Sequence, residues 1–176
     1  MRNIHLLAVG DVDRLLLEDL SEALSDTFGL SSQILPARLG PEFALHPTRM
    51  QYHSTEILGR LPSFVQPDTW RLLGVTELDL YIPILTFVFG EAQVGNSCAV
   101  VSTHRLRQEF YGLPSDGGVL RERLLKEAVH ELGHTLRLPH CEDYRCAMAP
   151  SHAVEWIDLK GSAFCPDCRA RAFAFT

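Results

Sequence analysis

The sequence predicts an α/β or α+β domain in which helices cover a mixed sheet. Over the first two-thirds of the chain, stretches of strand length alternate with stretches of helical periodicity. Three later strand candidates follow one another with no helix between them, so we expect at least one antiparallel edge. A chain of 176 residues can form one domain with a substantial core, and we expect a single domain over residues 1–176.

Turn and capping residues divide the first part of the chain into elements. In order we expect a strand (Ile4–Val9), a helix (Val12–Phe28), a strand (Ser32–Leu39), a loop (Pro41–Pro47) and a helix (Gln51–Leu61). Gly29 stands where the cap of the first helix is expected. Pro36 interrupts the second strand, and Gly59 with Pro62 closes the second helix.

The middle of the chain contains three strand candidates, and the strongest helix follows them. The strands are Arg71–Thr76, Leu85–Phe89 and Ser97–Ser102, with turns expected at Gly90 and at Gly95-Asn96. The helix runs from Leu120 to Leu136 and has an apolar arc of about 120°. This arc is formed by Leu124, Leu125, Ala128, Leu132, Thr135 and Leu136. Residues 141–168 are rich in loops and have little core of their own.

Charge and hydropathy exclude several classes of function. Sixteen basic against 22 acidic residues give a net charge of −6, and no block of Lys or Arg is present. This balance argues against a protein that holds a nucleic-acid backbone. No segment approaches the 18 or so apolar residues that span a membrane. The first apolar run is too short for a signal peptide, so we expect a cytoplasmic protein. We also expect a monomer.

The strongest helix carries the motif H-E-x-x-H. His130 and His134 are four residues apart, so they point the same way, about 40° apart around the helix axis and away from the apolar arc. Two imidazoles on one helix face suit a zinc site. Glu131 lies about 60° beyond His134, where it could contact a metal-bound water without being a ligand.

Two simpler interpretations of this motif are chance and a solvated helix face. A chain of this composition would contain the pentapeptide about 0.02 times by chance. The alternative of surface histidines paired with Glu131 and Glu127 stays open at this point. Six residues after His134, His140 can complete three nitrogen ligands and leave a fourth position for water, as in catalytic zinc sites. We give His152 no ligand role.

Four of the five cysteines crowd the end of the chain as C-x4-C…C-x-x-C. Cys141, Cys146, Cys165 and Cys168 form a closed set of four thiols, which is typical of structural zinc. Disulfides, a zinc-ribbon module for nucleic acid and a redox site at Cys165–Cys168 are the alternatives. The lack of a secretory signal disfavours disulfides, and the acidic neighbourhood disfavours a nucleic-acid module. A redox site would require a metal-free protein. The fifth, Cys98, is expected to be a small buried apolar residue.

These motifs resemble those of the archaemetzincin family of metzincin-type zinc peptidases. That family extends H-E-x-x-H-x-x-G-x-x-H with a cysteine directly after the third histidine, then C-x4-C-x-M and a later C-x-x-C. The chain has His140-Cys141, then Cys146-Ala147-Met148, and finally Cys165-Pro166-Asp167-Cys168. Residues 79–102 also look like the sheet region of the family. The resemblance implies that Met148 forms the Met-turn, packed beneath the three histidines without being a ligand.

One residue departs from the family pattern. The glycine between the second and third histidines is replaced by Arg137. A residue with a side chain loses about 1–2 kcal/mol in the left-handed conformation that glycine adopts there. Zinc binding is worth about 10–16 kcal/mol in structural sites, so we expect the turn to survive and His140 to remain a ligand.

The resemblance implies a metzincin-like zincin fold, with a twisted mixed sheet, an active-site helix and a small C-terminal part stapled by zinc. We divide the domain into residues 1–137 and 138–176. The implied function is hydrolysis of peptide bonds in a peptide or protein substrate by zinc-bound water, with Glu131 as general base. Two zinc ions per chain are expected, one catalytic and one structural. The competing hypothesis is a zinc-stabilised binding module with a vestigial or occluded histidine site.

Overall fold

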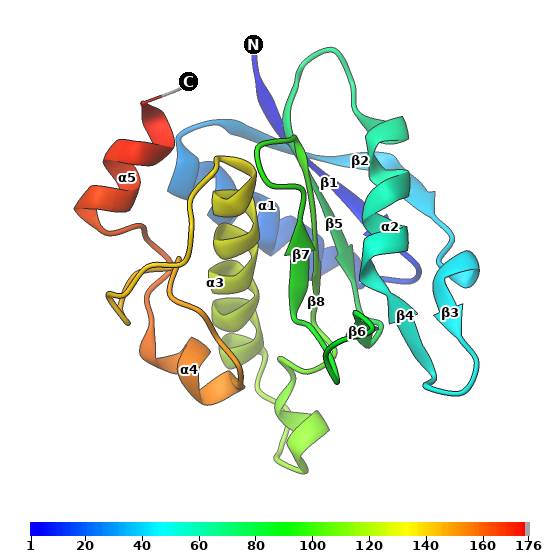
Figure 1. Cartoon of the computed structure of the whole chain (residues 1–176). Coiled ribbons are helices and arrows are strands. Elements are labelled where there is room, and N and C mark those ends of the chain that lie inside the picture. The colour runs from blue at the N-terminus through cyan, green and yellow to red at the C-terminus, as the bar shows by residue number, and fades with distance from the viewer. Residues whose placement is uncertain (175–176) are drawn as a thin grey trace.

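The structure, a computed structural model, describes residues 1–174. A mixed sheet forms its centre, with strands in the order β2-β1-β5-β8-β7 (Figure 1). The strands are β1 (Asn3–Val9), β2 (Ser31–Leu39), β5 (Thr69–Thr76), β7 (Gly90–Ala92) and β8 (Cys98–Ser102). Neighbours from β2 to β8 run parallel, and β7 pairs with β8 antiparallel. The expected α/β class and the antiparallel edge are confirmed.

Both faces of this sheet are buried, because apolar residues point alternately to opposite sides of the strands. In β1, Ile4 and Leu6 belong to one apolar cluster, whereas Leu7 and Val9 belong to another. Helices α1 (Arg14–Phe28) and α3 (Gly117–Thr135) cover the first face. Helix α2 (Ser54–Arg60) covers the second face (Figure 1).

The ends of the first helix follow from its sequence. The Asp13 carboxylate accepts a hydrogen bond from the Leu15 amide at 3.0 Å and caps the N-terminus. Gly29 ends the helix with a φ of 66°, as its position predicted. The edge strand β2 accommodates Pro36, and its pairing with β1 shifts register at that point.

A smaller sheet lies beside the central one, and two of the predicted elements differ from the structure in this region. It contains β3 (Leu45–His46), β4 (Gln51–His53) and β6 (Leu80–Tyr81) in the order β3-β4-β6. The helix expected over Gln51–Leu61 therefore begins only at Ser54, because the three residues before it pair with β3 and β6. The loop expected over 41–47 contains a 3₁₀ turn (Glu42–Ala44) and β3. Further 3₁₀ turns lie at Leu61–Phe64 and Gln108–Tyr111.

The strand expected over Leu85–Phe89 is wrong. Only a single bridge forms there, between Leu80 and Val88, and the strand begins at Gly90 instead of turning there. Two apolar residues of this segment form a ring contact instead of a strand: the centroids of Phe87 and Phe89 are 5.0 Å apart.

The C-terminal segment adds two short helices, α4 (Val154–Leu159) and α5 (Pro166–Phe173), to a stretch expected to be mainly loop. Its apolar residues join the cluster beneath α3 instead of forming a separate core. Polar contacts reinforce this packing: Arg123 on α3 binds the Asp158 carboxylate through two hydrogen bonds of 2.8 Å. Among residues 1–174, no helix is long and apolar enough to cross a membrane.

Gly133 on α3 is required by this packing. A Cβ at this position would overlap the Met148 Sδ and come within 3.1 Å of the Phe164 ring. We expect Gly133→Ala to lower the free energy of unfolding by about 1–3 kcal/mol, because overpacking outweighs the gain of about 1 kcal/mol in helix propensity. Urea unfolding followed by circular dichroism measures the change.

Gly59 on α2 offers the matched control. A Cβ there meets no atom within 4 Å. Gly59→Ala should therefore raise the stability by up to about 1 kcal/mol. Equal effects of the two substitutions would show that the contact between Gly133 and Met148 is unimportant.

Candidate metal centre and cleft

The three predicted histidines converge at the C-terminal end of α3. The Nε2 atoms of His130 and His134 are 3.1 Å apart, and the His140 ring lies 5.3 Å and 5.0 Å from their respective rings. The candidate ligand atoms of the three residues lie within 4.8 Å of one another. Nitrogens around a tetrahedral zinc are about 3.3 Å apart, since each Zn–N bond is about 2.0–2.1 Å. The arrangement therefore fits a three-histidine zinc site.

Backbone carbonyl groups orient two of the imidazoles. His130 Nδ1 donates to the Ala147 carbonyl, and His134 Nδ1 donates to the Leu138 carbonyl, both at 2.8 Å. These bonds place the proton on Nδ1 and leave each Nε2 free to bind a metal. Burial lowers the pKa of all three histidines, that of His130 to about 3, so the rings are neutral as metal ligands must be.

Helix α3 is buried on more sides than its sequence indicates. The sequence pattern leaves the face opposite the apolar arc open to solvent, yet Glu127, His130 and Glu131 are all buried. The Lys160 ammonium group, whose side chain is 0% exposed, lies 2.9 Å from the Glu127 carboxylate and donates to the Ala147 and Ala149 carbonyls. The alternative of solvated surface histidines does not fit this environment.

Glu131 lies in the same pocket as the histidines, where the edge strand β7 approaches α3. A Cβ on Gly90 would come within 3.0 Å of the Glu131 Oε1 and 2.6 Å of the Val100 carbonyl. Glycine at this position therefore allows β7 to approach the glutamate. Burial raises the pKa of Glu131 well above its usual value, and the Glu127 carboxylate raises it further.

A cleft of about 490 Å³ opens beside these groups. One side is the segment from Leu85 to Ala92, and the other is formed by α3 and Pro150–His152. His152, to which the sequence gives no ligand role, is exposed and lines this cleft next to His140. Glu91 contributes a buried carboxylate oxygen, Oε2, with no hydrogen-bond partner within residues 1–174. Sequence reasoning missed Gly90, Glu91 and Lys160, which have no motif spacing.

The four C-terminal cysteines also converge, and all five cysteines of the chain are free of disulfides. The Cys141 and Cys165 sulfurs are 3.8 Å apart, which matches the spacing of about 3.8 Å that Zn–S bonds of about 2.3 Å produce. The Cys146 sulfur accepts hydrogen bonds from two backbone amides, at 3.3 Å and 3.4 Å. Cys98 is buried in β8, as expected, and burial raises its pKa to about 11.

The two clusters are joined through the backbone. His140 is followed directly by Cys141, whose amide donates to the Met148 carbonyl at 2.9 Å. Met148 is fully buried, and its sulfur packs against Gly133. In the sequence Gly133 lies between His130 and His134. The cysteine cluster and the methionine therefore support the segment that presents the third histidine.

Arg137 adopts the left-handed conformation that the family glycine would adopt, with a φ of 66°. The Leu138 amide donates to the Gly133 carbonyl at 3.1 Å, and the Arg137 amide donates to the His134 carbonyl at 3.0 Å. This pair of bonds is a Schellman motif, which ends α3 and turns the chain toward His140. The guanidinium group packs over Gly95, where a Cβ would come within 2.9 Å of the Arg137 Cζ. The turn survives the substitution, as expected.

Comparison with known proteins identifies the class. The profile described as Peptidase family M54 matches residues 38–172. The archaemetzincin of Methanocaldococcus jannaschii is 44% identical, over 94% of this chain and 89% of its own. A crystal structure of the archaemetzincin from Archaeoglobus fulgidus, complexed with malonate, is 36% identical with a TM-score of 0.83, over 96% of this chain and 99% of its own. A zinc-dependent peptidase from Methanocorpusculum labreanum is 32% identical with a TM-score of 0.86 over the same shares.

Fold and family together define a zinc metallopeptidase. The chain belongs to peptidase family M54, the archaemetzincins. The resemblance inferred from the motifs is thereby confirmed.

The strain at Arg137 can be measured with two substitutions. Arg137→Gly and Arg137→Ala both remove the guanidinium contact with Gly95, but only alanine retains the left-handed strain. We expect the glycine variant to be more stable than the alanine variant by about 0.5–1 kcal/mol. This difference is the relief of backbone strain minus the larger entropic cost of ordering glycine on folding. Urea unfolding of the zinc-saturated proteins gives the difference. Equal stabilities would show that the turn is unstrained.

Proposed function

We propose that His130, His134 and His140 hold the catalytic zinc of this peptidase and that Glu131 is its general base. The observation that carries the proposal is the convergence of three neutral imidazoles, two of them with Nδ1 bound to backbone carbonyls. This leaves nitrogen donors directed at one point beside an open cleft. An open fourth position is typical of catalytic zinc.

Zinc bound there would polarise the scissile carbonyl and make a nearby water acidic enough to attack it at neutral pH. Glu131 accepts the proton of that water and afterwards delivers it to the leaving amine. Its position next to His130 on the helix and beside Gly90 of β7 supports this role. Glu127 is less suited to it, because its carboxylate pairs with Lys160.

The edge strand β7 provides a surface for the substrate backbone. It pairs with β8 on one side, and no strand within residues 1–174 pairs with its other edge. Residues of β7 line the cleft opposite the histidines. An extended peptide can add to such an edge through main-chain hydrogen bonds. We therefore propose that peptide substrates bind along β7 with the scissile bond between Glu131 and the histidines.

The cysteine cluster is proposed to hold a second, structural zinc. Four thiols with no open position suit such a site, and the sulfur spacing supports it. In this arrangement Met148 is the Met-turn residue, packed beneath the histidines. Closely spaced cysteines that form no disulfide also support a reducing, cytoplasmic location.

Removing the base tests the catalytic role. Glu131→Gln should lower kcat by about 10²–10⁴-fold, because the amide cannot accept the proton, while zinc content and fold remain unchanged. Cleavage of a fluorogenic peptide library by the zinc-loaded protein provides the measurement. Glu122→Gln is the matched control, because Glu122 lies on the same helix but on the surface, paired with Lys126. Full activity of the Glu131 variant would exclude the proposed base.

Zinc content tests the two proposed sites separately. Elemental analysis should give two zinc ions per wild-type chain and one in the His130→Ala, His134→Ala double variant, because the cysteine cluster remains intact. A Cys165→Ser, Cys168→Ser variant should lose the other ion. A single zinc that persists in the histidine variant would contradict the catalytic site.

A further inference from the structure

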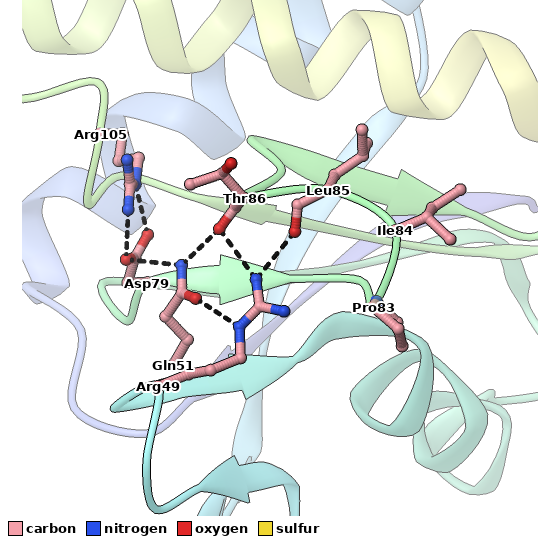
Figure 2. A pocket seen from close by; sticks show the side chains of 8 residues that line it. All are labelled: Arg49, Gln51, Asp79, Pro83, Ile84, Leu85, Thr86 and Arg105. Atoms are coloured by element: carbon pink, nitrogen blue, oxygen red, sulfur yellow. Dashed lines mark hydrogen bonds and ion pairs between the residues drawn. The ribbon is translucent and has the colours of Figure 1, made fainter.

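One wall of the cleft is a loop whose backbone is fixed by side chains. Residues 82–89, here called the rim loop, connect β6 to β7. Leu85 and Thr86 line the catalytic cleft and also a second hollow of about 550 Å³ on the other side of the loop. Figure 2 shows this hollow, with Arg49 and Gln51 directed at the loop.

The rim loop has little secondary structure of its own. Its backbone hydrogen bonds include one from the Leu85 amide to the Ile82 carbonyl at 3.0 Å and one from the Val88 amide to the Leu80 carbonyl at 2.9 Å. Ile84 is 86% exposed and Leu85 50% exposed, so apolar packing does not hold the tip. Such a segment opens easily unless other groups fix it.

Arg49 and Gln51 supply the missing constraint. Arg49 Nη2 donates to the Leu85 carbonyl at 2.8 Å and to the Thr86 carbonyl at 3.1 Å. Gln51 Nε2 donates to the same Thr86 carbonyl at 2.9 Å (Figure 2). Two consecutive carbonyls of the cleft wall are therefore held by Gln51, at the start of β4, and by Arg49 in the turn before it.

The guanidinium group is itself held in place. Its Cζ lies 3.9 Å from the centre of the Tyr81 ring, and its Nε donates to the Gln51 Oε1 at 2.9 Å. Met50, which lies between Arg49 and Gln51 in the sequence, adopts a left-handed φ of 54° at the end of the tight turn from β3. Backbone strain of this kind persists only where the surroundings impose it.

A second arginine anchors the other end of the network. Gln51 Nε2 also donates to Asp79, which accepts two hydrogen bonds of 2.7 Å and 2.8 Å from Arg105. The Arg105 guanidinium lies over the Phe87 ring at 4.3 Å, so it contacts the rim loop again. A planar guanidinium can satisfy several acceptors at once, which the point charge of a lysine does less well.

We propose that Arg49 is a positioning residue of this peptidase, which holds the backbone of the rim loop so that the cleft keeps the shape required to bind a peptide. The proposal rests on the proposed function. Arg49 does not line the catalytic cleft and acts through the Leu85 and Thr86 carbonyls. It therefore governs substrate binding and not the chemical step.

Steady-state kinetics of the zinc-loaded enzyme tests this role. Arg49→Ala should raise KM about tenfold and leave kcat within about twofold, because the histidines and Glu131 are untouched. Arg49→Lys should recover only part of the loss. Arg14→Ala is the matched control, since this exposed arginine on α1 pairs with Glu18, far from the rim loop in the sequence. A fall in kcat at unchanged KM would overturn the proposal.

Amide hydrogen exchange gives a second readout that needs no activity. In Arg49→Ala, exchange of the amides in residues 82–89 should become at least about tenfold faster, while that of α3 stays as in the wild type. Unchanged exchange in the rim loop would overturn the proposal whatever the kinetics. If no peptide is cleaved by the wild type, the proposed function fails, and the exchange result still decides whether Arg49 holds the loop.

Discussion

The carbonyl oxygen of Ala147 is the point at which the parts of the candidate site meet. It accepts the His130 Nδ1 bond at 2.8 Å and the Lys160 Nζ bond at 3.2 Å. Lys160 is fully buried and needs the Glu127 carboxylate as its partner, because an unpaired buried ammonium group is strongly destabilising. Helix α3, the segment beneath the histidines and the end of α4 therefore depend on one another.

The cysteine cluster extends this dependence to the third histidine. His140 belongs to no helix or strand, and its own position follows from the Schellman turn on one side and the Cys141–Met148 backbone bond on the other. The strain of a left-handed arginine is about 1–2 kcal/mol. Metal binding at the proposed site would be worth several times more, and the structure keeps the turn with an arginine at this position.

Much of the candidate site could be predicted from the sequence because its proposed ligands are local. His130, His134 and His140 lie within eleven positions, and helical geometry with one turn brings them together. Gly90, Glu91 and Lys160 could not be found in this way, because the pairing of β7 with β8 and the packing of α4 on α3 place them. The start of the helix expected at Gln51 was wrong for a related reason: the residues before Ser54 pair with β6, about 30 positions away.

The proposed ligands are close together in the sequence, whereas the residues that hold them in place are distant from them. This difference has a consequence for folding. Histidines on one helix and the adjoining turn can gather early, because short loops close quickly and at little entropic cost. The Lys160 contact, in contrast, joins α3 to residues 141–168, and the cysteine cluster lies within that segment. A chain still lacking that segment would carry the complete H-E-x-x-H sequence but not the Ala147 carbonyl that orients His130. The proposed mechanism therefore requires a completed fold, and an unfinished chain would not yet hydrolyse peptides.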